Sequence, residues 1–252
     1  MNQQVEEFIQ DYIAALRNGS AAVFAGAGLS KATGFVDWKT LLRSIAHNIG
    51  LSIDKESDFV ALTQYSINEH RGRYHINQLL VDEFSKKVAI TENHKILASL
   101  PIKTFWTTNY DSLIEDALCQ SGKTPDVKIT QENLATNQDK CDAIVYKMHG
   151  DIGQPHDAVI SKEDYENFNN KRPLFSAALQ GDIVSKTFLF IGFSFSDPNI
   201  DYILSRIRVL LGQNQRNHYC FLRKIQRADY KNFKEFIYAQ TRQNLQIKDL
   251  KR

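Results

Sequence analysis

Near its N-terminus the chain reads Val23-Phe24-Ala25-Gly26-Ala27-Gly28-Leu29-Ser30, an apolar run followed directly by two glycines. The apolar run 21–24 predicts a buried strand, and the glycines directly after it predict a tight turn. Because glycine has no side chain, such a turn can approach a ligand closely, and a helix that begins there aims free N–H groups at an anion. The pattern suits a pyrophosphate, although Lys31 stands where the usual dinucleotide fingerprint has its third glycine. By itself the stretch is equally typical of an ordinary turn.

Apolar segments further along predict the other strands of a sheet. They alternate with helical patterns, which is typical of a doubly wound, mostly parallel, Rossmann-like α/β sheet with helices on both faces. We expect clear strands at 21–24, 104–107, 143–147, 187–192 and 218–222, and short ones near 127–130 and 159–160.

Apolar side chains spaced three and four residues apart predict amphipathic helices. The expected helices lie at 5–17, 41–49, within 57–87 with a polar break at 69–74, at 93–99, 113–118, within 162–181, after 199 and in the charged tail 223–252. The polar composition of 151–181 indicates a small helical covering subdomain. His70 and His75, near the polar break, have no metal-ligand partner at helical spacing, so we expect them at the surface.

Composition excludes several classes of protein. The 252 residues are 42% hydrophobic, enough for a sizeable core, and the net charge of +2 without charge runs gives no sign of a nucleic acid or membrane partner. The three cysteines are far apart, so neither a disulfide framework nor a four-cysteine zinc site is expected, and the cytoplasm is the expected compartment. No apolar run approaches about 18 residues, and the polar N-terminus resembles no signal peptide.

Four of the expected strands end in polar turns, and a parallel sheet gathers such ends at one edge. We therefore expect four segments to converge on one site: 26–30, 108–111, 149–151 and 192–199.

In this order the four turns resemble the sirtuin (Sir2-like) family. Gly26-Ala27-Gly28-Leu29-Ser30 with Gly34 and Asp37 is similar to the family's cofactor loop, and Thr108-Asn109-Tyr110-Asp111 to its Thr/Gln-Asn-Ile-Asp element. His149-Gly150 is similar to the catalytic His-Gly, and Gly192-Phe193-Ser194 to the Gly-Thr-Ser turn. The resemblance is strongest to one branch, the NAD hydrolase domains of bacterial antiphage defence proteins. Two departures from the deacylases, the missing cysteine module and Asp37-Trp38 in place of Asp-Phe-Arg, argue against acyl-lysine binding.

The resemblance implies cleavage of the bond between ribose and nicotinamide in NAD, without a metal. His149 is the expected general base, since an imidazole pKa near ~6.5 suits proton removal from water or a ribose hydroxyl. Asn109 is the second expected catalytic residue and would hold the water or a ribose hydroxyl, and Asp111 would fix its loop or steady positive charge. The expected cofactor-binding residues are Ala25, Gly26, Ala27, Gly28, Ser30, Asp37, Thr108, Asp111, Gly192, Ser194, Asp197 and Asn199, with Asp201 a further candidate for ribose contact.

The resemblance also implies an organisation. Residues 1–252 would form one Sir2-like domain with helical inserts at about 55–95 and 151–181, and the parent protein would carry a C-terminal nucleotide-sensing domain. Homo-oligomers and regulation by a nucleotide signal would follow, with the helix 5–17 and the helices after 200 as candidate interfaces.

Other interpretations stay open. An NAD-dependent protein deacylase and a non-catalytic module that binds NAD or ADP-ribose are the alternative functions. Residues 109–111 could cap the following helix, and Asp197-Pro198 could be a helix start. Trp38, Phe193 and Phe195 are more typical of a core than of a pocket.

Overall fold

A computed structural model of the chain describes residues 3–193, 195, 197–222 and 246–249. Its centre is a seven-stranded sheet of order β3-β4-β2-β1-β5-β6-β7, in which every neighbouring pair is parallel. The strands are β1 (Ala21–Ala25), β2 (Thr104–Thr107), β3 (Pro125–Lys128), β4 (Ala143–Lys147), β5 (Thr187–Ile191), β6 (Tyr219–Leu222) and β7 (Gln246–Asp249). Strand β1 lies between β2 and β5, so the strand order reverses at its carboxyl end, where open α/β sheets bind ligands. The predicted fold class is confirmed.

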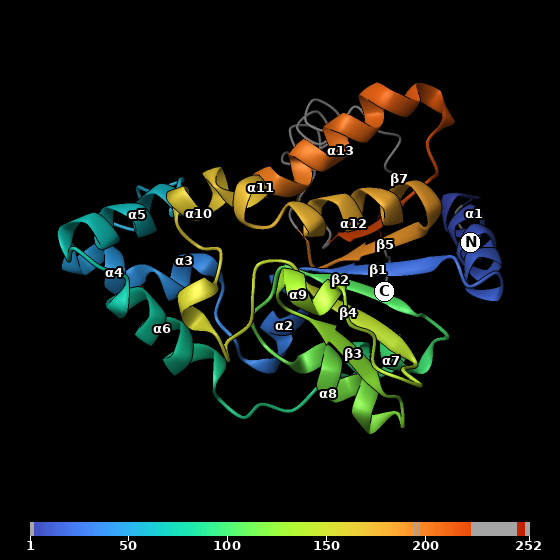
Figure 1. Cartoon of the computed structure of the whole chain (residues 1–252), viewed down its shortest axis with the longest axis horizontal. Helices are drawn as coiled ribbons and strands as arrows, with labels where there is room; N and C mark the ends of the chain where they lie inside the picture. The colour runs from blue at the N-terminus through green and yellow to red at the C-terminus, as the bar shows by residue number, and fades with distance from the viewer. Residues whose placement is uncertain (1–2, 194, 196, 223–245, 250–252) are drawn as a thin grey trace.

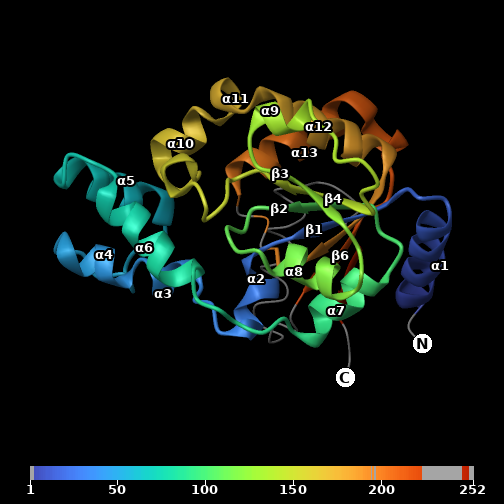
Figure 2. The same cartoon turned by 60° about the horizontal axis from the view of Figure 1, so that its bottom comes forward.

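Helices cover both faces of the sheet (Figures 1 and 2). On one face α12 (Pro173–Ser185) and α13 (Pro198–Leu211) pack on the aromatic side chains of β1, β2 and β5. On the other face α7 (Glu92–Ser99) and α8 (Leu113–Gln120) pack on the smaller side chains of β1 and β4, together with α1 (Gln3–Arg17). Burial of two separate apolar layers explains why β1 is apolar at every position.

A helical lobe lies beyond the carboxyl ends of the strands, at the end of the sheet opposite α1 (Figure 1). It comprises α3 (Trp38–Leu41), α4 (Arg43–Asn48), α5 (Phe59–Glu69) and α6 (Tyr74–Phe84). The cover expected at 151–181 consists of η2 (Pro155–Asp157), α10 (Lys162–Glu166), α11 (Phe168–Lys171) and α12. The described residues also form the short helices α2 (Ala27–Ser30), η1 (Lys31–Thr33), α9 (Gln131–Leu134) and η3 (Gly212–Asn214). Tyr110, in the turn after β2, belongs to the core of this lobe, so the lobe is anchored to the sheet edge.

Several expected elements are confirmed in detail. The polar break at 69–74 separates α5 from α6. The structure adds that Gly19 follows the first helix with a φ of 68° and that Ser161 and Asp164 form a capping box at α10. His70 and His75 are exposed as expected. Phe193 and Phe195 lie in the core, and partly buried Trp38 packs against the core of the lobe.

Other expectations are wrong. Residues 159–160 form no strand: they lie in a loop, with Val159 buried in the core layer under α12 and α13 and Ile160 buried in the core of the helical lobe. Residues 246–249, expected to be helical, form β7 beside β6. The rest of the expected tail helix lies outside the described residues. No helix among the described residues is long and apolar enough to cross a membrane.

Candidate active site at the carboxyl ends of the strands

The turns after β1 and β5 touch backbone to backbone. The Gly26 amide donates to the Ile191 carbonyl at 3.0 Å, and the Gly28 amide donates to the Gly192 carbonyl at 2.8 Å. A Cβ on Gly28 would lie 2.8 Å from the Gly192 backbone, and a Cβ on Gly192, whose φ is +66°, would lie 2.2 Å from the Leu29 nitrogen. The glycines are therefore required for this contact between two turns, a reason that the sequence pattern did not supply.

Asn109 ties the turn after β2 to the turn after β1. Its side-chain nitrogen donates to the Gly26 carbonyl at 3.2 Å and to Ser30 Oγ at 3.0 Å. Its backbone nitrogen donates to Thr107 Oγ1, which in turn donates to the Ala25 carbonyl. The side chain is only 8% exposed, so this network fixes its position.

Lys147, the last residue of β4, is a buried cation that the sequence interpretation missed. Its ammonium group donates to the Tyr110 carbonyl at 3.2 Å and to the Asp111 carbonyl at 2.6 Å. It also pairs with Glu115 at 3.2 Å and with Asp151. The Lys147 side chain is fully buried, and these carboxylates raise its pKa against the lowering effect of burial. We call this group the Lys147 cluster; it holds the turns after β2 and β4 together.

Asp111 lies two residues before α8, and its side chain bonds to the first residue of that helix, as the helix-cap interpretation expected. Its Oδ1 accepts from the Leu113 nitrogen at 3.1 Å. Its Oδ2 is buried without a hydrogen-bond partner among the described residues.

His149 follows β4 and is buried under the helical cover. Its ring is 2% exposed and packs edge-on against Tyr165 of α10 and Phe168 of α11, with ring centroids 5.3 and 5.8 Å away. Burial lowers its pKa below the ordinary 6.5, and Arg172 lowers it further, while Asp197 and Asp164 act in the opposite direction. The imidazole is therefore neutral at pH 7, the form that a general base requires.

Asp197 lies beside His149, although 48 positions separate them in the chain. Its Oδ2 is 3.3 Å from His149 Nε2, but the two atoms are not aligned as a hydrogen bond, and Nε2 has no other partner among the described residues. Its Oδ1 accepts from the Asn199 and Ile200 nitrogens and so caps α13. The helix-start interpretation is confirmed, and the same side chain faces the expected base. We call Asp197, His149 and Tyr165 the His149 cluster.

The remaining expected residues divide into two groups. Asn199 lies in the same region, 6% exposed, and its side-chain nitrogen has no partner among the described residues. Asp37 is placed differently: its carboxylate pairs with Lys31 at 2.7 Å and caps α3, with 44% of the side chain exposed. Ala25 is buried within β1, Ala27 is exposed and Thr108 is half-buried. Ser194 lies outside the described residues.

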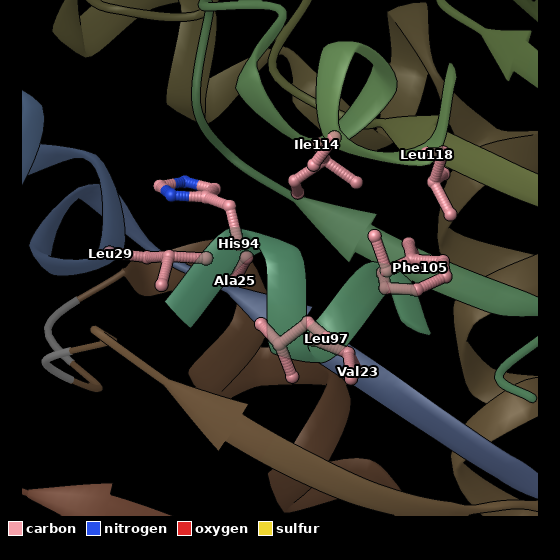
Figure 3. A pocket seen from close by; sticks show the side chains of 10 residues that line it. Val23, Ala25, Leu29, His94, Leu97, Phe105, Ile114 and Leu118 are labelled. Atoms are coloured by element: carbon pink, nitrogen blue, oxygen red, sulfur yellow. The ribbon is translucent and has the colours of Figure 1, made fainter. Parts of the chain in front are cut away.

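A small cavity lies behind the site, between the sheet and helices α7 and α8. Its volume is about 10 Å³, and the only polar side chain among those that line it belongs to His94. Figure 3 shows His94 and Leu29 at one end and Phe105 and Leu118 at the other. A space of this size suits no more than one water molecule, so we do not place a ligand there. Within the described residues no group of three or more His, Cys, Asp or Glu side chains is arranged to hold a metal ion.

Comparison with known proteins now assigns the family. The model of the SIR2-like domain matches residues 103–243, which include the Asn109 and His149 turns. The chain belongs to the SIR2-like family. The family resemblance indicated by the four turns is thereby confirmed.

Individual relatives are similar over most of the chain. The "NAD(+) hydrolase ThsA" of Bacillus cereus is 53% identical over 253 residues, covering 100% of this chain and 53% of the relative. The protein of the same name from Enterococcus faecium is 48% identical, over 97% of this chain and 53% of the relative. "Defense-associated sirtuin 2" of Bacillus subtilis is 28% identical over 83% of this chain and 21% of the relative. The chain thus spans about half the length of the ThsA proteins that it matches.

Proposed function

We propose that the chain is an NAD glycohydrolase that cleaves the nicotinamide–ribose bond to give nicotinamide and ADP-ribose, and that it acts in bacterial antiphage defence by depleting NAD. One structural observation carries the proposal: a buried, neutral imidazole lies at the sheet edge where three other polar turns meet. The printed names of the ThsA relatives support the choice of NAD as substrate.

The reaction needs a base and a fixed ribose. His149 takes one proton from the attacking water; the water oxygen bonds to C1′ of the ribose, the C1′–N bond breaks, and neutral nicotinamide leaves with the electron pair of that bond. The imidazolium then releases its proton to solvent. Asn109 positions the water or a ribose hydroxyl, since its carbonyl oxygen stays available while its nitrogen is committed to Gly26 and Ser30.

Buried polar atoms without partners support a polar ligand at this edge. The Asp111 Oδ2, the Asn199 nitrogen and the His149 Nε2 are all buried and unpaired among the described residues, and a ribose, an amide or a water would satisfy them. The Gly26 and Gly28 turn and Ser194 are proposed to lie against the pyrophosphate. Because the Gly28 amide already donates to Gly192, we assign Gly28 to the shape of the turn rather than to a phosphate contact.

Burial of His149 also suggests how the enzyme is controlled. Tyr165 and Phe168 cover the ring, so NAD reaches it only when α10 and α11 move. We propose that homo-oligomerisation, driven by a nucleotide-sensing domain of the parent protein, opens this cover in the bacterial cytoplasm. The chain would be one Sir2-like domain whose inserts, 55–95 and 151–181, include the cover. A strictly monomeric preparation with the same specific activity as the oligomer would contradict the assembly step.

The test is NAD consumption by the purified chain, with the products separated by chromatography. We expect nicotinamide and ADP-ribose, and we expect His149→Ala and Asn109→Ala to lose about 100-fold or more of the rate, the usual contribution of a positioned base or of a polar group that stabilises the transition state. His94→Ala is the matched control, because His94 is equally buried at 2% exposure but lies on α7, and its rate per folded molecule should stay near that of the wild type.

The same assay separates the alternatives. With an acetyl-lysine peptide added, formation of O-acetyl-ADP-ribose from NAD and the acetyl group would favour the deacylase. The binding module would be favoured if the folded parent protein bound NAD but did not hydrolyse it, even with the activating nucleotide signal present.

A further inference from the structure

The two carboxylate oxygens of Asp197 have different neighbours. Oδ1 accepts from the Asn199 and Ile200 nitrogens at 2.9 and 3.2 Å and caps α13. Oδ2 lies 3.3 Å from His149 Nε2, and both side chains are nearly buried, at 9% and 2% exposure. An N-cap needs one oxygen, and Ser or Asn caps a helix as well as Asp does. The cap therefore accounts for the position of Asp197 but not for a negative charge beside the imidazole.

We propose that Asp197 is a positioning residue for His149, whose carboxylate orients the imidazole and stabilises the imidazolium that forms when His149 accepts a proton. This inference rests on the proposed function, in which His149 is the base. Because the two groups are not aligned as a hydrogen bond, the carboxylate acts chiefly through its charge, which is effective in a buried site. The rigid attachment of Asp197 to the start of α13 fixes the distance between them.

The groups around His149 determine the sign of the effect. Asp197 on α13 and Asp164 on α10 raise the pKa of His149, and Arg172, directly before α12, lowers it. Arg172 is itself paired with Asp157 at 2.5 Å, and Asp164 with Arg73 at 2.7 Å, so both of those charges are largely compensated by their partners. Asp197 has no cationic partner of this kind among the described residues, and of the nearby carboxylates it raises the pKa of His149 most.

Tyr165 completes the arrangement. Its ring lies against His149, and its hydroxyl is close enough to the Asp197 carboxylate for the carboxylate charge to act on it. Burial and the nearby Asp197 charge raise the pKa of the Tyr165 hydroxyl well above its ordinary value, so it stays protonated and can act only as a donor to the carboxylate. The Asp197 carboxylate thus has a neutral phenol and the imidazole as neighbours.

The decisive variant is Asp197→Asn, which keeps the shape and a helix cap but removes the charge. The first readout is the pKa of His149 measured by NMR titration of the imidazole signals in the full chain, with the His149 signal identified by its loss in His149→Ala. We expect this pKa to fall by about one unit or more in Asp197→Asn. An unchanged or higher pKa would overturn the proposal.

The second readout is the pH dependence of kcat/KM for NAD. In Asp197→Asn we expect the acid limb to move to lower pH, because the base now loses its proton more readily, and the plateau to fall roughly tenfold or more, because a weaker base accepts a proton less readily in the transition state. Asp197→Ser, which keeps a cap but is too short to reach His149, should behave like Asp197→Asn. An unshifted acid limb with a wild-type plateau in both variants would overturn the proposal.

Asp58→Asn is the matched control. Asp58 caps α5 in the same manner, its carboxylate accepting from the Ala61 nitrogen at 2.9 Å, but it lies in the helical lobe. We expect its pH profile and the His149 pKa to be those of the wild type. Should the wild type fail to hydrolyse NAD, the proposed function would be wrong, while the NMR titration would still decide whether Asp197 governs the proton affinity of His149.

Discussion

Two buried basic side chains lie two residues apart at the end of β4, and they differ in how completely their polar atoms are hydrogen-bonded. Lys147 has oxygen neighbours from Tyr110, Asp111, Glu115 and Asp151 around its ammonium group. Among the described residues His149 has one carboxylate within ion-pair distance, that of Asp197 at 3.3 Å, and its Nε2 lacks a hydrogen-bond partner there.

The difference separates a structural group from a chemical one. A cation bonded on every side cannot exchange its proton without breaking those bonds, so the Lys147 cluster fixes the turns that carry Asn109 and His149. An imidazole that is buried, neutral and incompletely bonded can accept a proton at low cost in rearrangement. The Lys147 cluster faces α8 and the His149 cluster faces α11 and α13, so each can be altered separately.

The largest expected effect on stability comes from Lys147→Met. The variant leaves the carboxylates of Glu115 and Asp151 without their cation, and removal of one partner of a buried ion pair costs about 3–5 kcal/mol. Denaturant unfolding measures this loss. Lys162→Met is the control, because Lys162 is 59% exposed and its ion pair with Glu166 is 3.8 Å long, so its effect should stay within about 0.5 kcal/mol. Equal losses of unfolding free energy in the two variants would show that Lys147 does not hold the turns of the site together.

Gly192→Ala tests the contact between the turns after β1 and β5. The new Cβ would clash with the Leu29 nitrogen and force alanine into a left-handed conformation, and we expect a loss of about 2–4 kcal/mol. Gly181→Ala is the opposite control: the position is helical and open, so alanine should stabilise the protein by about 0.5–1 kcal/mol. Unfolding midpoints that move in the same direction would contradict this account of the glycines.

Acidification should distinguish the two clusters. Burial lowers the pKa of His149 in the folded state below its ordinary 6.5, so the unfolded chain binds the proton more tightly. The contribution of neutral His149 to the free energy of unfolding is therefore fully present above pH 6.5. It is lost as the pH falls toward the folded-state pKa, at no more than about 1.4 kcal/mol per pH unit. His149→Gln should therefore lose less stability than the wild type on acidification. Unfolding curves at several pH values test this, and parallel pH dependences would contradict it.

His218 is also buried and has a lowered pKa, but it does not affect the comparison of wild type with His149→Gln. Burial lowers the pKa of His218 to about 4, and the loss of stability that this causes below pH 6.5 occurs equally in both proteins. It cancels in the difference between wild type and His149→Gln.

The sequence predicted what depends on local pattern. Apolar runs and helical spacing predicted the sheet and most helices, and the rule that parallel strands end at one edge predicted that the Asn109 and His149 turns follow neighbouring strands at the same edge. The four residues of β7 were missed, because a short strand at a sheet edge has no periodicity long enough to distinguish it in a charged tail. The buried residues 159–160 look like a strand, since apolar side chains in a packed loop give the same pattern.

The pairings within the site could not be predicted. Nothing in the residues near Lys147 in the sequence indicates that its side chain is buried. The burial depends on Glu115 of α8, which lies far away in the sequence and pairs with the lysine. Asp197 has the pattern of a helix cap, which it is, and nothing local indicates that its second oxygen faces a histidine from another strand. Such pairings depend on the three-dimensional packing of turns rather than on the residues within any one turn.

The smallest effect that we predict concerns the hydrogen bond between the side chains of Asn109 and Ser30. Ser30→Ala removes one acceptor of the Asn109 side-chain nitrogen and leaves the Gly26 carbonyl, so stability should fall by about 1 kcal/mol. In a double-mutant cycle Ser30→Ala and Asn109→Ala should be coupled by about 0.5–1 kcal/mol, because the two side chains share a hydrogen bond. Ser30→Ala and Asp197→Asn share no contact and should be additive. If Ser30 were instead coupled to Asp197 and not to Asn109, the turn after β1 would respond to the charge beside His149. The site would then not consist of a rigid set of turns and a separately acting histidine.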